Sequence, residues 1–406
     1  MEQRPLAGVK VVELGTHVAV PTATRLMADW GADVIKVEGL SGDPWRVFGG
    51  TMHAPVSADE NPVFNLQNAN KRTVALNLKS PEGLAILHKL LAQADVFVSN
   101  VRLHSLEKMG LSYDALHEKY PGLVYYHFTG FGYEGEEAER PGFDIAAFWA
   151  RTGALVDWAD PDGRVINPAP GFGDNTVSAH ILSGLLAALY YKEKTGVGIR
   201  TTSSLFSSGI WYNGSALATC QPRYGNRFPK YRTEATNPFL EAYRCKDGER
   251  MIIAALNYDA YREKMFRLMG LEAYLDDPRF ANSKVLQEHL PEIFALMDEA
   301  FLTKDRAEWC AIFDAADIVY EKAVHFADVL NDKQAWANGY LTNVTWRNGA
   351  EAVMPQSPIQ FFGSEAPGFR QTGAVGRDTR SVLEGLGLSD AEITALAEKK
   401  AVGTVD

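Results

Sequence analysis

The stretch GVKVVELGTHVAVPTATRLMADWGADVIKVE, at residues 8–38, holds the pattern from which a fold class follows. Val9–Leu14 is a short run rich in β-branched residues, and Ala32–Glu38 alternates apolar with polar residues, so both predict strands. Between them, Thr22–Trp30 has the pattern of a helix, and Gly31 follows in the position where helices often end. A strand, a helix and a second strand in this order are typical of a mainly parallel sheet covered by helices.

The same alternation continues outward along the chain. Further strands are predicted at Thr73–Leu78, Val96–Ser99, Leu123–Phe128 and Ile199–Leu205. Helices are predicted from Pro81 to about Ala94, at Tyr113–Tyr120 and at Asp174–Thr195. Ser80 is a good N-cap for the first of these helices, because its hydroxyl can accept a hydrogen bond from the first turn. We therefore expect an α/β fold.

The pattern changes near residue 220. Phe239–Arg244 and Met251–Ala255 flank an Asp-Gly turn and predict a hairpin. Helical patterns follow at about Tyr258–Met269, Pro291–Leu302 and Arg306–Ala315, and two more close the chain at Asp378–Leu386 and Ser389–Glu398. We expect a large domain over residues 1–224, a smaller α+β domain over 225–325, and a C-terminal segment, 326–406, that returns to the large domain.

Composition limits the classes of partner. The chain has 406 residues and a net charge of −11, which argues against a general nucleic-acid or anionic-membrane surface. Its three cysteines, Cys220, Cys245 and Cys310, form no CxxC pair, so we expect no disulfide framework and a reducing compartment. The N-terminus lacks a signal-peptide pattern, and the most apolar segment, Ile181–Tyr191, is about half the roughly 20 residues that span a bilayer. A soluble cytoplasmic protein is expected.

Two features of the sequence argue against a nicotinamide site and a metal site. Gly130–Gly135 matches G-x-G-x-x-G, but three carboxylates and Pro141 follow it, so we expect a glycine-rich loop rather than a nicotinamide site. The nine histidines form no ligand spacing, so no metal cofactor is expected. His127 lies in a strand pattern and is expected to be packed rather than catalytic.

Polar residues at the predicted element ends leave two interpretations open. Asp174 follows Gly171-Phe172-Gly173 at a helix start, where it is either an N-cap or a carboxylate nucleophile with room for a bulky electrophile. Several basic residues lie near the ends of predicted strands, where α/β sheets bind ligands. A phosphate-rich ligand and a solvated surface explain them equally well; they are Lys71, Arg72, Lys79, Arg102 and Lys108.

Several stretches together resemble the class III CoA-transferases, the formyl-CoA transferase-like or CaiB/BaiF family, over essentially the whole chain. Besides residues 8–38 they are GDPWR at 42–46, NANKRTVALNLKSPEG at 68–83, ADVFVSN at 94–100, LEKMGLSYDAL at 106–116, PGFDIAAFWARTG at 141–153, GFGDNTVSAHILSGLLAALYYKEKTGVG at 171–198 and VGRDTRSVLEGLGLSDAEI at 375–393. Within the family the chain is most similar to the branch that acts on 2-hydroxy acids such as phenyllactate or 2-hydroxyisocaproate in amino-acid fermentation.

The resemblance implies a fold and a site. It implies a Rossmann-like large domain formed by both termini, a smaller domain between them, and an interlocked dimer of ring-shaped subunits. It implies that Asp174 is the catalytic nucleophile, that CoA thioesters are substrates and no other cofactor is needed, and that a 2-hydroxyacyl-CoA dehydratase acts in the same pathway. The CoA-binding positions that it implies are Val18, Ala19, Leu76, Asn77, Leu78, Lys79, Asn100, Val101, Arg102 and Lys108.

The implied chemistry transfers CoA through an aspartyl-CoA thioester, with backbone N–H groups near Gly171–Gly173 or the helix start as expected oxyanion donors. Two departures stand out. The glycine-rich loop of formyl-CoA transferase is missing near residues 235–245, and Gly39 replaces a CoA-contacting arginine, for which Arg46 is the expected substitute. The alternatives are an α-methylacyl-CoA racemase and a non-catalytic CoA-binding protein. Phe143 replaces the histidine of the racemase, and we expect no other titratable group there.

Aromatic residues suggest where an acyl group would bind. Phe143, Phe148, Trp149, Trp211 and Tyr212 are candidates for an aromatic acyl pocket, with core packing as the alternative.

Overall fold

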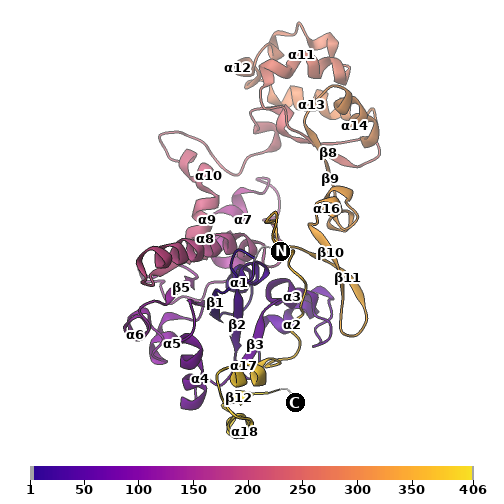
Figure 1. The fold of residues 1–406 in the computed structure, drawn as a ribbon. Helices are drawn as coiled ribbons and strands as arrows, with labels where there is room; N and C mark the ends of the chain where they lie inside the picture. Colours follow the sequence, from indigo (N-terminus) through magenta and orange to yellow (C-terminus); the bar gives the residue numbers. More distant parts are fainter. Residues whose placement is uncertain (1–3, 405–406) are drawn as a thin grey trace. The chain divides into compact units, whose positions relative to one another are not determined.

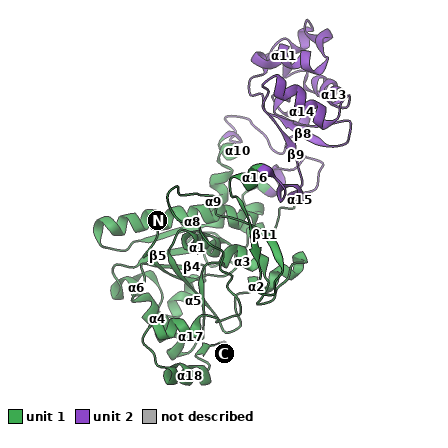
Figure 2. Cartoon of the chain, turned by 45° about the vertical axis from the view of Figure 1, so that its right-hand side comes forward, with its two compact units in different colours: residues 1–154, 167–218, 334–406 green, residues 155–166, 219–333 purple. Residues whose placement is uncertain are grey.

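The protein is described by a computed structural model covering residues 4–404. Contacts divide the chain into two compact units, which Figure 2 colours separately. Unit 1 consists of residues 1–154, 167–218 and 334–406, and unit 2 consists of residues 155–166 and 219–333. Residues 155–166, expected within the large domain over residues 1–224, thus belong to unit 2, where the Tyr231 hydroxyl donates to the Asp162 carboxylate at 2.7 Å.

A seven-stranded sheet forms the centre of unit 1, with the order β12-β3-β2-β1-β4-β5-β6 (Figure 1). The strands are β1 (Lys10–Leu14), β2 (Asp33–Glu38), β3 (Arg72–Leu76), β4 (Val96–Ser99), β5 (Val124–Thr129), β6 (Arg200–Ser204) and β12 (Val402–Gly403). All neighbours are parallel except β12, which pairs antiparallel with β3 and so places the end of the chain in the same sheet. In register, Val12 of β1 lies between Ile35 and Phe97.

Helices cover both faces of this sheet, which is why its strands are apolar almost throughout. On one face, α1 (Ala19–Asp29) packs against α8 (Phe172–Thr195). The other face is closed by α4 (Pro81–Leu91), α5 (Leu103–Lys108), α6 (Tyr113–Lys119), α17 (Thr379–Gly385) and α18 (Asp390–Glu398), which share a core with the strands. The predicted α/β class is therefore confirmed.

Smaller elements complete unit 1. Its other helices are α2 (Trp45–Phe48), α3 (Pro62–Asn68), α9 (Leu205–Tyr212) and α10 (Gly214–Thr219), and a π-helical turn spans Asp144–Ala150. A hairpin is formed by β10 (Leu341–Thr345) and β11 (Glu351–Pro355). Two short helices, α7 (Ala154–Asp157) and α16 (Lys333–Ala337), lie where the chain passes between the units.

Unit 2 has its own core. Its antiparallel sheet has the order β7-β8-β9 and the bounds Ala242–Arg244, Arg250–Ile253 and Tyr320–Ala323. The predicted hairpin and helices are confirmed: α11 is Tyr258–Met269, α13 is Leu290–Phe301 and α14 is Arg306–Ala315, accompanied by α12 (Ser283–Leu286) and α15 (Phe326–Val329). Among residues 4–404, no helix has the length and apolar character needed to cross a membrane.

A fully buried cluster of charged side chains lies between the sheet and α1. Glu13 pairs through its two oxygens with Lys36 at 2.8 Å and Lys71 at 2.7 Å, and Lys36 also reaches Asp43 at 2.9 Å. Burial alone would raise the pKa of Glu13, but the two lysines lower it to about 2. Lys71 was a candidate phosphate ligand; that interpretation is wrong, because its ammonium group is enclosed and is bonded to Glu13, Asn68 and the Pro21 carbonyl.

Candidate active site

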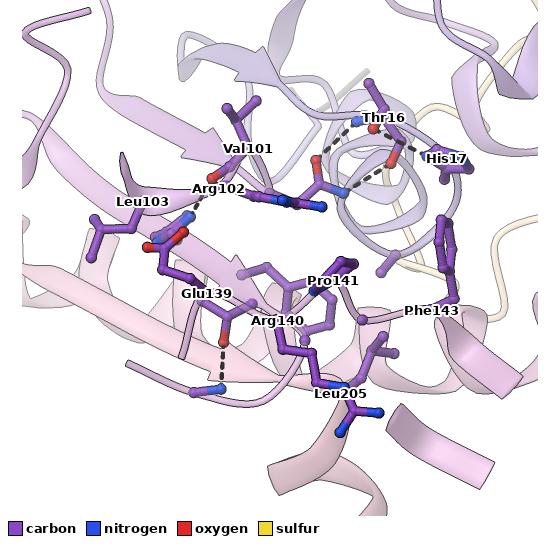
Figure 3. A pocket seen from close by; sticks show the side chains of 18 of the residues that line it. Thr16, His17, Val101, Arg102, Leu103, Glu139, Arg140, Pro141, Phe143 and Leu205 are labelled. Carbon is purple, nitrogen blue, oxygen red and sulfur yellow. Dashed lines mark hydrogen bonds between the residues drawn. The ribbon is translucent and has the colours of Figure 1, made fainter. Parts of the chain in front are cut away.

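A pocket of about 260 Å³ opens at the carboxyl ends of β1, β4 and β5 in unit 1 (Figure 3). The strand order reverses between β1 and β4, and doubly wound sheets bind ligands at such a reversal because the flanking loops diverge there. The wall comes from the loops after these strands, the glycine-rich loop, the start of α8 and Leu205. Residues of this wall include Thr16, His17, Val18, Ala19, Asn100, Val101, Arg102, His127, Thr129, Tyr133, Glu139, Arg140, Phe143 and Asp174.

The residues expected to bind CoA fall into two places. Val18, Ala19, Asn100, Val101 and Arg102 line this pocket, together with Asp174. The second group lies outside its wall: Leu76, Asn77, Leu78 and Lys79 at the end of β3, and Lys108 at the end of α5. β3 is two strands away from β1, on the same carboxyl edge of the sheet.

Asp174 is held by the first turn of α8. That helix begins at Phe172, and Gly171 precedes it in the left-handed conformation with φ 73°. Asp174 is therefore inside the helix, and its interpretation as the N-cap is wrong. Gly173 is required by packing, since a Cβ atom there would lie 2.4 Å from Asp144 Oδ1 and 2.7 Å from a Phe148 ring carbon. The helix thus starts close against the segment that carries Asp144.

The carboxylate of Asp144 caps α8 in place of Asp174. Its Oδ2 accepts the N–H groups of Gly173 at 3.0 Å and of Asp174 at 3.3 Å, and Phe172 N donates to the Ala169 carbonyl at 3.1 Å. The N–H groups of Phe172, Gly173 and Asp174 are therefore already used and are not available as the expected oxyanion donors. Burial and the neighbouring charge of Asp144 raise the pKa of Asp174 to about 8.

The raised pKa predicts how activity depends on pH. Asp174 is neutral below its pKa and anionic above it, and only the anion is a nucleophile, so kcat/KM for acyl-CoA should rise with pH and level off above about 8. Asp144→Asn removes the neighbouring charge, so the rising limb should move to lower pH. A pH–rate profile measures this shift, with the exposed Asp114→Asn as control. An unmoved limb in Asp144→Asn would contradict the coupling of the two carboxyls.

His127, in the wall, behaves as a packed histidine. Its Nε2 lies 2.7 Å from the Val101 carbonyl oxygen, and its Nδ1 contacts the Tyr133 hydroxyl. Burial lowers its pKa, so the ring is neutral, and both nitrogens have partners. The ring therefore joins β5 to the loop after β4 and to the glycine-rich loop.

Sequence reasoning missed His17. Its ring lies in edge contact with Phe143, with centroids 5.7 Å apart, and Figure 3 shows the two side by side at one end of the pocket. The expectation that no titratable group lies near Phe143 is therefore wrong. The one available signal was position, because His17 follows the carboxyl end of β1 and precedes α1.

Comparisons with known proteins identify the family. The family model described as CoA-transferase family III matches residues 6–379. The chain belongs to CoA-transferase family III. It is 40% identical over 98% of its length to (R)-2-hydroxy-4-methylpentanoate CoA-transferase of Clostridioides difficile, covering 99% of that protein. It is 36% identical over 97% of its length to cinnamoyl-CoA:phenyllactate CoA-transferase of Clostridium sporogenes, covering 96% of that protein.

A solved structure agrees with this assignment. The crystal structure of a CaiB/BaiF family protein from Brucella suis matches with a TM-score of 0.80 and 26% identity, covering 95% of this chain and all of that one. The protein is thus an enzyme, a CoA-transferase, and its α/β fold with a parallel central sheet is that of the family.

Two expectations about ligand-binding residues of this CoA-transferase are corrected. Arg46, the expected substitute for an arginine at position 39, forms a two-pronged ion pair with Glu38, both contacts 2.7 Å, and donates to the Gly373 carbonyl. It therefore holds the chain together rather than presenting a free charge. The five aromatic residues proposed for an acyl pocket do not gather there: Phe143 lines the pocket, Phe148 and Trp149 are buried in packing, and Trp211 and Tyr212 are exposed.

Proposed function

We propose that this CoA-transferase moves CoA from an acyl-CoA to a 2-hydroxy acid such as phenyllactate or 2-hydroxyisocaproate, with Asp174 as the covalent carrier. The observation that carries the proposal is the placement of Asp174 on the pocket wall, in the first turn of a 24-residue helix. The names of the two relatives described above support the class of acid. The direct test is a panel of acyl-CoA donors and 2-hydroxy acids, with products identified by mass.

The chemistry follows from a carboxylate that attacks a thioester. Asp174 attacks the acyl carbonyl carbon, the C–S bond breaks, and a mixed anhydride and CoA thiolate result. The thiolate then attacks the aspartyl carbonyl, releasing the donor acid and forming an aspartyl-CoA thioester. The acceptor carboxylate attacks this thioester and expels the thiolate, which finally attacks the acceptor's acyl carbon and restores the Asp174 carboxylate. Each step exchanges one acyl–oxygen or acyl–sulfur bond for another, so the thioester energy is conserved without ATP.

The oxyanions of these steps need donors other than the start of α8. Val18 and Ala19 line the pocket at the start of α1, and the first N–H groups of a helix have no partner within it. We expect the first-turn N–H groups of α1 to stabilise the oxyanions.

Two basic residues, Arg102 and Lys79, are expected to bind the phosphates of CoA. Arg102, in the pocket wall, and Lys79, at the end of β3, are both exposed. Replacing either by alanine should raise the KM for acyl-CoA roughly ten- to a hundredfold, because a charge-assisted contact to a phosphate contributes about 1.5–3 kcal/mol. Steady-state kinetics should show little change in the KM for the acceptor acid, and Lys89→Ala on α4 serves as the control. An unchanged CoA dependence in both variants would assign these cations to solvated surface.

Transfer and racemisation make opposite predictions about the α-carbon. In the transfer mechanism only carboxyl groups react, so in heavy water the enzyme should exchange acyl groups without incorporating deuterium at Cα. The stereocentre should survive, and one enantiomer should be preferred because the pocket is chiral. Mass spectrometry of the recovered acyl-CoA measures both. Because His17 lies beside Phe143, His17→Gly should be run in parallel. Deuterium incorporation at the rate of turnover would restore the racemase alternative.

The proposal extends to assembly and pathway. We expect an interlocked homodimer in the cytoplasm, and a dehydratase that consumes the 2-hydroxyacyl-CoA product. Exposed apolar side chains such as Phe362, which is 95% exposed in the isolated chain, support an assembly that covers them. Sedimentation equilibrium measures the mass of the assembly directly.

A further inference from the structure

The buried charge cluster leads to one residue of the pocket wall. Lys36 holds Asp43 through Oδ2, and the other oxygen of Asp43 accepts the backbone N–H groups of His17 at 3.1 Å and Trp45 at 2.9 Å. Burying such charges is costly, and removing one partner leaves an uncompensated charge. The buried ion pair of Lys36 and Asp43 therefore fixes the backbone of His17 in place.

The backbone of His17 is itself unusual. Its φ is 64°, in the left-handed region, which glycine adopts at no steric cost and most other residues avoid. Such conformations persist where the surroundings enforce them, and they cluster at functional sites.

Most other polar side chains of the wall already have protein partners. Asn100 bonds both the N–H and the carbonyl of Thr16, and Glu139 bonds His104. His127 and Tyr133 bond each other, and Thr129 accepts the N–H of Gly132.

The imidazole of His17 differs from these groups. Its Nδ1 shares a hydrogen bond with Thr16 Oγ1 at 3.1 Å, while Nε2 has no partner among residues 4–404. Its ring is therefore a hydrogen-bonding group on this wall that is still open to a ligand, whereas Asp174 is expected to react with the acyl carbon.

The starts of α1 and α8 lie side by side, and His17 and Asp174 line the same pocket. Val18 packs against Gly171, 3.4 Å from where its Cβ would be, and Thr22 Oγ1 donates to Asn175 Oδ1 at 3.0 Å. An acid whose carboxyl group reacts at Asp174 carries its 2-substituent on the carbon next to that carboxyl carbon. The imidazole at the adjoining helix start is placed to meet it.

We propose that His17 determines specificity by hydrogen-bonding the 2-hydroxyl group of the substrate acid through Nε2, with Asp43 as its positioning residue. The inference rests on the proposed transfer to a 2-hydroxy acid and names the group that recognises the hydroxyl. Sites built to bond a hydroxyl discriminate strongly against the acid that lacks it, since a polar group is then left without a partner.

The test compares 2-hydroxy-4-methylpentanoate with 4-methylpentanoate as acceptors. The left-handed backbone allows a clean pair of variants: His17→Gly removes the imidazole without strain, and His17→Asn tolerates the same φ while keeping donor and acceptor atoms. The measured quantity is the ratio of kcat/KM for the two acids. We expect His17→Gly to lower this ratio about ten- to a hundredfold and His17→Asn to keep most of it. His53→Gly, an exposed histidine with φ 59°, is the matched control.

Each other outcome is decisive. A wild-type preference that persists in His17→Gly overturns the role of His17 while leaving the proposed function intact. If both His17→Gly and His17→Asn lower kcat/KM equally for the two acids, His17 has a purely structural role, and this result also overturns the proposal. A wild-type enzyme that transfers CoA neither to these two acids nor to phenyllactate instead refutes the proposed function itself.

Discussion

Replacing Asp174 with alanine should lower the rate of CoA transfer by roughly 10⁴-fold or more, because losing the nucleophile removes every covalent step. Asp174→Asn should be nearly as inactive, since an amide is a poor nucleophile; slow deamidation would restore part of the rate with time. The covalent intermediate should be visible directly. Incubation with acyl-CoA followed by hydroxylamine should leave a hydroxamate on the peptide that contains Asp174, as read by mass spectrometry.

The control for this experiment is Asp114→Ala, which removes an exposed carboxylate from the first turn of a different helix, α6. It should retain both the rate and the hydroxylamine adduct. Full activity in Asp174→Ala would refute the mechanism, and an adduct on another carboxylate would move the nucleophile elsewhere in the pocket.

Replacing Glu13 with leucine should destabilise the protein by about 3–5 kcal/mol, the usual cost of breaking a buried ion pair from one side. Glu13 is fully buried and bonds Lys36, Lys71 and the hydroxyl of Thr24. Its loss leaves the enclosed Lys71 without its carboxylate partner and Lys36 with Asp43 alone. Urea unfolding followed by circular dichroism measures the change. The exposed pair Arg267–Glu263 offers the matched control, and Glu263→Leu should cost less than about 1 kcal/mol.

The same carboxyl predicts a dependence of stability on pH. The pKa of Glu13 is about 2 in the folded state, against an ordinary value of 4.5, so its contribution to the free energy of unfolding is fully present above pH 4.5. The contribution is lost as pH falls towards 2, and Glu13→Leu should lack this part of the acid transition. Identical acid transitions in the two proteins would show that Glu13 contributes no net ion-pair stability.

Local patterns were sufficient for most elements. The helix at Tyr258–Met269 has the predicted bounds, because Asn257 caps it and Gly270 ends it in a left-handed conformation. α1 begins at Ala19, before the predicted Thr22, since Pro21 is tolerated in the first turn of a helix, where no N–H is needed. The predicted start of α1 was therefore too late, because Pro21, a residue that usually interrupts a helix, lies in its first turn.

The sequence by itself determined the α/β class, the alternation of strands and helices, and, through its family motifs, the choice of Asp174 as the residue to test. Only the tertiary structure decided which side chains meet. Lys71, a candidate for phosphate, is enclosed with Glu13, while Asp144 caps the helix of Asp174 from 30 positions earlier. Hydropathy patterns report which face of an element is buried, whereas partners from different strands and loops are set by how helices pack on the sheet. A charged residue in a sequence therefore carries no local mark of whether it will face a ligand or another charge.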